Sequence, residues 1–263
     1  MFDWRNCYTR YINLDSRLDR NNHMKSELLK AGINAGRFSA LKISEHNERA
    51  KTMKWRMNGG NVGCHYSQVQ VMKDALENNE DAFIMEDDLV FCSDIQKRLD
   101  YINNFCNTHD WDVFFLGATF HANPTWHALR HINMPQCRCT LNRDYEITDD
   151  ERILRTYGIW STYAYIVNKN SIQKILDLFD KYLHESIGID YLFIRIQPMI
   201  NAFALIPGSI KQMDNKSDIG IGVTNFSGFS KLGEYWYQDN MENFEPKKLS
   251  EYADCIKLPL QKI

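Results

Sequence analysis

Apolar residues along this chain form short runs that alternate with stretches of helical spacing. The short runs predict strands at residues 8–14, 33–41, 83–91, 111–117, 161–168 and 202–207. The amphipathic stretches predict helices from Arg17 to Gly32, from near Gly63 to Asn79, from Ser93 past Phe105, from Asn170 past Phe179, and from near Asp190. This alternation predicts an α/β fold with a mixed, mostly parallel sheet flanked by helices.

Local signals mark several helix ends. Gly32 is placed to end the first helix, because glycine adopts the left-handed conformation that follows many helices. Ser93 and Gln96 have the spacing of a capping box, and Asn170 is a typical cap for the helix that follows it. We therefore expect the first helix to end at Gly32 and the later helices to begin at Ser93 and Asn170.

Three segments have no regular pattern. Residues 121–155 predict a long excursion that lines or covers a site, and the polar, glycine-rich residues 211–228 predict a loop. The segment 230–263 has no assigned structure. Because the chain shows no internal repeat and no linker-like composition, we expect residues 1–263 to form one domain, with 230–263 as a C-terminal extension.

Composition narrows the class of protein. The chain has 263 residues, of which 44% are hydrophobic, so it can bury the core of one large domain. A net charge of -3 gives no basic field for a nucleic-acid partner. No apolar run approaches the ~18 residues of a membrane span, and the opening MFDWRNCYTR has no apolar signal segment. The odd number of cysteines, seven, favours a reduced, cytoplasmic compartment, with peripheral membrane attachment left open.

The most informative stretch is FIMEDDLVF at residues 83–91, where Glu86, Asp87 and Asp88 interrupt an apolar run. Adjacent acids repel one another, so a cation is expected beside them. Because side chains alternate along a strand, Glu86 and Asp88 would face one way and Asp87 the other, which gives a pair of oxygen ligands for a divalent metal. The carboxyl end of a strand is where open α/β sheets bind ligands. The alternative interpretation is a solvated turn with a chance run of acids.

The motifs then show a family resemblance. They occur in order as YINLDSRLDR at 11–20, GRF at 36–38, VGCHYS at 62–67, IMEDDLVF at 84–91, WDVFFLG at 111–117, STYAYIV at 161–167, GID at 188–190 and IPGSIKQMDNKSDI at 206–219. This series resembles glycosyltransferase family 25, which includes lipooligosaccharide and procollagen galactosyltransferases. The resemblance implies a GT-A-type fold and manganese or magnesium. It also implies inverting transfer of galactose or glucose from a UDP-hexose donor to a hydroxyl of a glycan or protein acceptor.

The resemblance also assigns roles to residues around the donor. Asp88 is expected to be a direct metal ligand, and Glu86 is expected to face the ribose or the metal, with Asp87 completing the acidic motif. The family segment beside the nucleotide is matched by Asn13, Leu14, Asp15 and Arg17. A phosphate contact and a solvated helix start are equal alternatives for Arg17, and the solvated start is favoured for Arg20.

A second group of residues matches a glycine-cysteine-x-x-serine run of the family. Gly63 and Ser67 are expected to lie at a helix start, where amide groups meet donor phosphate or sugar. Cys64 is expected to be a small buried residue in the helix packing. Gln68 stands where the family commonly has histidine, which leaves the role of that position open.

Residues of the second half supply the remaining candidates. Asp190 is the candidate general base for an inverting transfer, with a helix cap as the alternative. Gln212 and Ser217 match a late family motif that would close over donor or metal, although a polar loop contains such residues without a function. The aromatic candidates for a sugar-stacking face are Trp126, Trp160, Tyr163 and Tyr165, and core packing is the alternative for each of them.

Two rival classes are compatible with parts of this pattern. A nucleotidyltransferase on the same sheet would carry a glycine-rich N-terminal loop followed by a basic residue, and residues 11–20 contain none. A non-catalytic UDP-sugar-binding or scaffold protein would keep the fold without the chemistry, but the acidic triplet and Asp190 are all present. Cys137 and Cys139 form a lone C-x-C pair without a partner pair at zinc spacing, so no role is assigned to them.

Overall fold

The computed structural model describes residues 1–43, 59–117, 145–150, 152–159, 162–184, 188–206 and 208–213. The expectations for Trp126, Cys137, Cys139, Trp160, Ser217 and residues 230–263 lie outside these ranges. The C-terminal extension therefore stays a prediction.

The described residues form a large sheet with a small second sheet beside it. The eight strands of the large sheet are β1 (Tyr8–Asn13), β2 (Gly36–Ser39), β3 (Ala82–Met85), β5 (Val113–Phe115), β6 (Tyr145–Ile147), β7 (Ile153–Thr156), β8 (Ala164–Val167) and β9 (Ala202–Leu205). Their spatial order is β2-β1-β3-β8-β5-β9-β7-β6. Only β7 and β8 run opposite to the other described strands, so the sheet is mixed and mostly parallel, as predicted. In the small sheet, β4 (Leu89–Phe91) pairs antiparallel with β10 (Ile210–Gln212).

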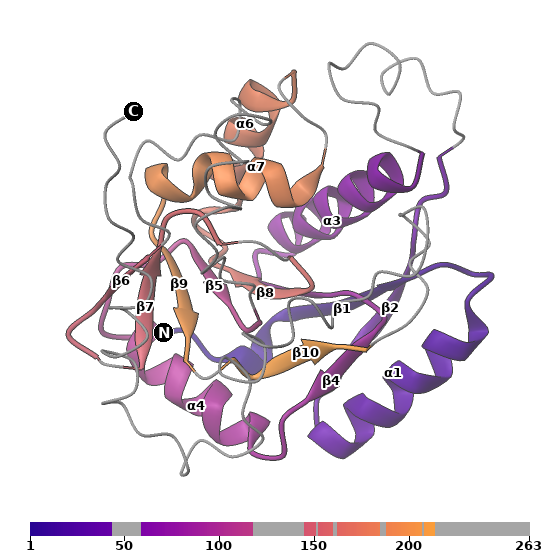
Figure 1. The fold of residues 1–263 in the computed structure, drawn as a ribbon, viewed down its shortest axis with the longest axis horizontal. Coiled ribbons are helices and arrows are strands. Elements are labelled where there is room, and N and C mark those ends of the chain that lie inside the picture. The colour runs from indigo at the N-terminus through magenta and orange to yellow at the C-terminus, as the bar shows by residue number, and fades with distance from the viewer. Residues whose placement is uncertain are drawn as a thin grey trace, which may run out of the picture.

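Helices cover both faces of the large sheet. They are α1 (Leu18–Ala31), α3 (Gly59–Glu77), α4 (Ile95–Cys106), α6 (Ile172–Tyr182) and α7 (Ile189–Ile196), with short 3-10 turns η1 (Trp4–Asn6) and η3 (Gln197–Met199). Figure 1 shows α3, α6 and α7 on one side of the sheet and α1 and α4 on the other. The predicted α/β architecture is confirmed.

Strand alternation divides the core between the two faces. Ile84 and Tyr165 contribute to the apolar cluster under α3, α6 and α7. Their neighbours Phe83 and Ile166 contribute to the cluster under α1 and α4. Each of these side chains is fully buried. Because both faces of the central strands are covered, their sequences are continuous apolar runs instead of alternating polar and apolar residues.

The first helix forms and ends as its sequence predicts. Met24 and Leu28 are buried on its inner face. Gly32 adopts a φ of 63°, and its N–H donates to the carbonyls of Leu28 and Leu29. This left-handed residue ends α1 and turns the chain towards β2.

Several expected helix starts are wrong. The second helix begins at Gly59, before Gly63. The residue that caps α4 is Asp94, which makes no side-chain capping bond, and Gln96 instead donates 3.0 Å to the Ala31 carbonyl. For α6 the cap position is Ser171 rather than Asn170. Packing against distant elements decides these boundaries, which local capping patterns do not encode.

Strand predictions also need correction. The run at 83–91 is two strands in two different sheets, because β3 ends at Met85 and β4 begins at Leu89. Within the predicted excursion, β6 and β7 form an antiparallel pair at the sheet edge. Within the predicted polar loop, β10 pairs with β4. In the described part of the chain, no helix combines the length and the apolar character needed to span a bilayer.

The order of the strands places a topological switch beside the acidic residues. From β1 the chain passes through α1 to β2 on one side, and α3 then returns it to β3 on the other side of β1. α1 and α3 lie on opposite faces of the sheet (Figure 1), and the strand order reverses at β1, so the carboxyl ends of the parallel neighbours β1 and β3 lie side by side at the switch point. Ligands of open α/β sheets bind at such positions.

Candidate active site

A buried hydrogen bond joins the carboxyl ends of β1 and β3. Asn13 is the last residue of β1 and is 1% exposed. Its Nδ2 donates 2.7 Å to Oδ2 of Asp87, which follows β3 in the acidic turn 86–88. The acidic turn is therefore tied to the neighbouring strand at the switch point.

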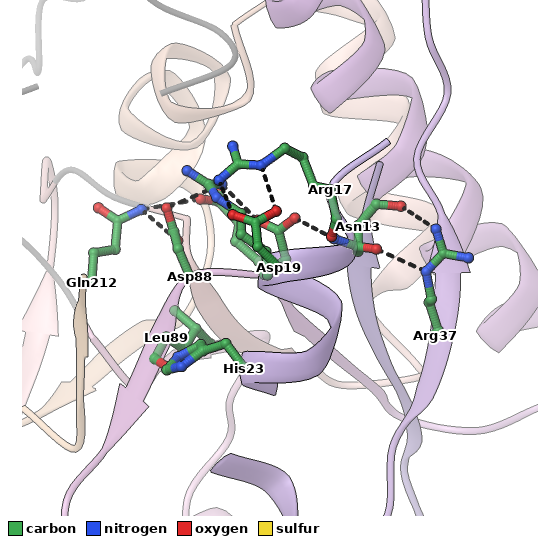
Figure 2. A network of polar contacts seen from close by, with 11 residues as sticks. Asn13, Arg17, Asp19, His23, Arg37, Asp88, Leu89 and Gln212 are labelled. Atoms are coloured by element: carbon green, nitrogen blue, oxygen red, sulfur yellow. Dashed lines mark hydrogen bonds and ion pairs between the residues drawn. The ribbon is translucent and has the colours of Figure 1, made fainter. Parts of the chain in front are cut away.

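The chain itself supplies a positive charge beside the acids, where the sequence predicts a cation. Arg20, in the first turn of α1, is 9% exposed. Its Nη1 lies 2.7 Å from Oδ1 of Asp87 and 3.3 Å from Oδ2 of Asp88. The expectation of a solvated Arg20 is wrong, because α1 packs against β4 and His23 Nε2 lies 2.6 Å from the Leu89 carbonyl oxygen (Figure 2).

The other two acids share an amide partner. Gln212, the last residue of β10, donates from Nε2 to Glu86 Oε2 at 3.1 Å and to Asp88 Oδ1 at 3.4 Å. The Met213 N–H donates 2.8 Å to the Asp88 carbonyl, which fixes the end of β10 over the acidic turn. Glu86 and Asp88 thus converge on Gln212, whereas Asp87 is held by Asn13 and Arg20. Because β3 ends at Met85, this division arises in a turn, whereas the sequence predicts it along a strand.

The acidic turn is under electrostatic strain. Burial raises the pKa of Glu86 well above its usual value, and the charges of Asp88, Asp190 and Asp87 raise it further. Burial also raises the pKa of Asp88, with Arg20 acting in the opposite direction. A further cation would stabilise both carboxylates in their charged form. Among the described residues no group of three histidine, cysteine or acidic side chains is arranged to hold a metal.

Asp190 lies on α7, on the opposite side of the sheet from α1 (Figure 1). It lies in the first turn of α7, and its Oδ1 accepts from the Thr162 N–H at 2.9 Å and from Thr162 Oγ1 at 3.0 Å. The residue at the cap position of α7 is Gly188, so the helix-cap alternative for Asp190 is wrong. The charge of Asp190 contributes to raising the pKa of Glu86, so the two carboxyl groups interact electrostatically.

A second arginine, Arg37 of β2, completes the network on the other side of Asn13. Its Nε donates 2.9 Å to Asn13 Oδ1, and its Nη2 donates to Asn13 O at 3.1 Å and to Asp15 Oδ1 at 2.5 Å. Ser39 donates to the same oxygen of Asp15 at 2.8 Å, and the hydrogen bonds from Arg37 and Ser39 lower the pKa of that exposed carboxyl. Figure 2 shows Arg37 and Gln212 at the two ends of the polar network. The sequence pattern assigns no role to Arg37, although Arg37 belongs to the GRF motif and β2 pairs with β1.

The remaining nucleotide-side candidates lie in the turn from β1 to α1. Arg17 binds Asp19 with both Nε and Nη2, at 3.0 and 2.8 Å (Figure 2). The Leu14 carbonyl accepts 2.9 Å from the Arg17 N–H, which closes the turn. Leu14, Asp15 and Arg17 therefore surround the carboxyl end of β1.

A comparison with known families matches this arrangement. The sequence model of glycosyltransferase family 25, described as an LPS biosynthesis protein, matches residues 9–193. The chain belongs to glycosyltransferase family 25. No curated protein sequence matches it. The matched span runs from β1 into α7, so it includes the acidic turn and Asp190, whereas Gln212 lies beyond it.

In this family 25 glycosyltransferase, Gly63 and Ser67 lie inside a helix. Since α3 begins at Gly59, the Gly63 amide is already in the second turn, where N–H groups bond within the helix. A Cβ at Gly63 would lie 2.2 Å from the Leu41 carbonyl oxygen. Ser67 is fully buried, donates 2.6 Å to the Gly63 carbonyl and accepts 2.8 Å from the Leu41 N–H. The expectation of a helix start here is wrong, and the contact of both residues with donor stays a prediction.

Gln68, the position that departs from the family pattern, has a buried role in the glycosyltransferase. Its Oε1 accepts 2.6 Å from the Tyr165 hydroxyl, and its Nε2 lies 3.4 Å from Cys64 Sγ. Cys64 is partly buried against the core, and burial together with the charges of Glu86 and Asp190 raises the pKa of its thiol. Tyr165 also packs edge-on against Phe193 of α7, with 5.0 Å between ring centroids, so these residues link α3 and β8 to α7.

The aromatic candidates within the described residues are core residues. Tyr165 is fully buried, and Tyr163 is 8% exposed. Burial raises the pKa of both phenols. Neither ring presents an exposed face for a sugar, so the core alternative holds for these two tyrosines.

Proposed function

We propose that this glycosyltransferase uses a divalent metal and transfers galactose or glucose from a UDP-hexose, with inversion, to a hydroxyl of a glycan or protein, in a GT-A-type active site. One observation carries the proposal. Glu86 and Asp88 converge at the carboxyl end of β3, at the switch point, with pKa values raised by burial and by neighbouring acids. Such a pair of carboxylates favours a hard divalent cation.

The residues present fit Mn²⁺ or Mg²⁺ shared with a diphosphate. Asp88 and Glu86 would hold the ion through carboxylate oxygens, and Gln212 would adjust beside them. The donor diphosphate is proposed to complete the coordination. When bound, the metal neutralises the charge that develops on the departing diphosphate.

The nucleotide is proposed to lie along the turn after β1. Asn13, Leu14 and Asp15 would form the wall beside it, with Asn13 held in place by Asp87 and Arg37. Arg17 would contact phosphate. Its present partner Asp19 is mostly exposed, and an exposed ion pair contributes little, so a phosphate can replace that carboxylate. Gly63 and Ser67 would fix the backbone that closes the opposite wall.

Asp190 is proposed to take the proton from the acceptor hydroxyl as that oxygen attacks the sugar carbon. The two hydrogen bonds from Thr162 to Oδ1 fix the carboxylate plane. Attack on the face opposite the diphosphate gives inversion, and a base fixed before the acceptor arrives needs no reorganisation.

Calorimetric titration tests the donor assignment. UDP, UDP-galactose and UDP-glucose are titrated into the purified protein with Mn²⁺ and then with chelator. The proposal expects binding that requires the metal, followed by transfer to a hydroxyl acceptor with the inverted anomer detected by NMR. Absence of binding to all three ligands would reject the UDP-sugar donor, and binding without any turnover would favour the non-catalytic alternative.

A further inference from the structure

Arg20 occupies an unusual position for a charged side chain. It is almost fully buried between the first turn of α1 and the acidic turn, and its Nη1 contacts both Asp87 and Asp88. The amino end of a helix carries a partial positive charge, so α1 and the guanidinium both favour the acids. The link spans 67 residues of sequence, so it is a feature of the tertiary fold.

The contacts divide the three acids into two kinds. Both carboxylate oxygens of Asp87 accept a hydrogen bond, one from Asn13 and the other from Arg20, each at 2.7 Å. Asp88 makes two longer contacts: one carboxylate oxygen lies 3.3 Å from Arg20 Nη1, and the other lies 3.4 Å from Gln212 Nε2. Glu86 accepts from Gln212 Nε2 at 3.1 Å, and no ion pair between Glu86 and Arg20 is found in the described part of the chain. Arg20 therefore withdraws Asp87 from the metal side of the turn and holds Asp88 loosely.

The charges of the turn point to a specific consequence. Three carboxylates and one guanidinium leave two negative charges when all are ionised, which one divalent cation balances. Without Arg20, the buried carboxylates of Asp87 and Asp88 would lie beside the partly buried Glu86 without this cation, and such a group is costly to bury. When both are present, a metal and the Arg20 guanidinium would compete for the carboxylate of Asp88.

We propose that Arg20 is a positioning residue that competes with the divalent metal for Asp88, so that the acidic turn binds metal poorly until the donor diphosphate brings further ligands. The inference rests on the proposed metal role of Glu86 and Asp88. Arg20 would make metal binding depend on the donor, because its positive charge already partly neutralises the acidic turn.

The test compares Arg20→Met with the wild-type protein. Methionine keeps much of the buried volume and removes the charge. Mn²⁺ affinity without nucleotide is measured by calorimetry, and the unfolding midpoint is measured in chelator and in Mn²⁺. The variant should be less stable in chelator, regain part of that loss in Mn²⁺, and bind Mn²⁺ alone on the order of tenfold more tightly than the wild type.

Lys174→Met is the matched control. Lys174 Nζ lies 2.8 Å from Oδ2 of Asp112, a buried carboxylate at the amino end of β5. Its removal also takes the cation from a buried acid, but, burial apart, the described groups that shift the pKa of Asp112 are Lys174, Ser171 and Asn201, none of which is a carboxylate. The control should lose stability without gaining Mn²⁺ affinity, which separates competition for metal from a general cost of breaking an ion pair.

The outcomes distinguish this inference from the proposed function. If the wild type binds Mn²⁺ with UDP and Arg20→Met gains no affinity for Mn²⁺ alone, competition by Arg20 is rejected and the metal site stands. If no protein binds Mn²⁺ even with UDP, both proposals fail. Should Arg20→Met not fold, the double variant Arg20→Met/Asp87→Asn removes one charge of each sign and decides the question. It is expected to bind Mn²⁺ alone more tightly than the wild type, and equal affinity would overturn the inference.

Discussion

Thr162 donates two hydrogen bonds to one carboxylate oxygen of Asp190, from its backbone N–H at 2.9 Å and from its hydroxyl at 3.0 Å. Thr162 directly precedes the stretch that leads into β8, and Asp190 lies in the first turn of α7. The pair therefore connects the central sheet to the helix that carries the candidate base. A carboxylate held in this way has one fixed plane.

Replacing Asp190 by asparagine should keep donor binding and remove transfer. The amide has nearly the same volume but cannot accept the acceptor proton, so the transfer rate should fall by about 10²- to 10⁴-fold, with UDP affinity measured by calorimetry unchanged. Normal transfer by Asp190→Asn would remove it as the base.

Thr162→Val should lower kcat by about tenfold without changing KM for the donor, because it removes only the hydroxyl bond that orients Asp190. Thr162→Ser, which keeps the hydroxyl, serves as the control and should retain most of the activity. Equal kcat values for the two variants would show that the hydroxyl bond does not serve catalysis.

Asp88→Asn should abolish metal-dependent UDP binding while the fold stays intact. One metal oxygen is lost at nearly constant volume, and the affinity for UDP in Mn²⁺ should fall by at least about tenfold. Asp177→Asn on the exposed surface of α6 is the control, with no change expected. Metal-dependent binding that persists in Asp88→Asn would move the metal site elsewhere.

The sequence predicts the elements that local pattern determines. The first helix with its glycine end and the acids at the carboxyl end of a buried strand both follow from residues close together in the chain. The partners of those acids do not. Arg20 and Asp87 are 67 residues apart, and Gln212 and Asp88 are 124 apart. An arginine at a helix start gives the same local signal whether it is solvated or buried, and only the packing of α1 on β4 decides between them.

Short strands with polar residues also escape prediction. β10 contains Lys211 and Gln212 in a polar stretch, so its sequence indicates a loop. It forms a strand because β4 offers an unpaired edge, and Arg98, fully buried on α4, donates 2.9 Å to the carbonyl of Gly208 just before it. The position of Gln212 over the acids therefore depends on a partner strand far away in sequence.

Gly63→Ala should destabilise the protein by about 2 kcal/mol, because the new Cβ would lie 2.2 Å from a backbone oxygen of Leu41 that cannot turn aside. Gly36→Ala is the matched control. A Cβ there would meet the side chain of Arg10, nearest at 2.8 Å, which can move, so a change within about 0.5 kcal/mol is expected. Urea unfolding measures both. Equal effects of the two substitutions would contradict the close approach of Leu41 to α3.

His65 should make the stability of the fold depend on pH below neutrality. It is 3% exposed on α3 beside Phe179, and its Nδ1 has no hydrogen-bond partner among the described residues. Burial, with a smaller effect of the Lys73 charge, lowers the pKa of His65 from 6.5 to about 4. The imidazole of His65 therefore becomes protonated near pH 6.5 in the unfolded chain but only near pH 4 in the folded protein.

The sign follows from that difference in proton binding. Between pH 6.5 and pH 4 the unfolded state binds more protons, so stability falls as the pH falls through this window. From pH 7 to pH 5 the contribution of His65 amounts to about 2 kcal/mol of lost unfolding free energy. Urea unfolding of the wild type and of His65→Phe at both pH values measures it, since phenylalanine keeps an aromatic ring and cannot be protonated. The variant should lose less stability than the wild type over this range, and an identical loss in both proteins would show that His65 is already accessible to protons in the folded state.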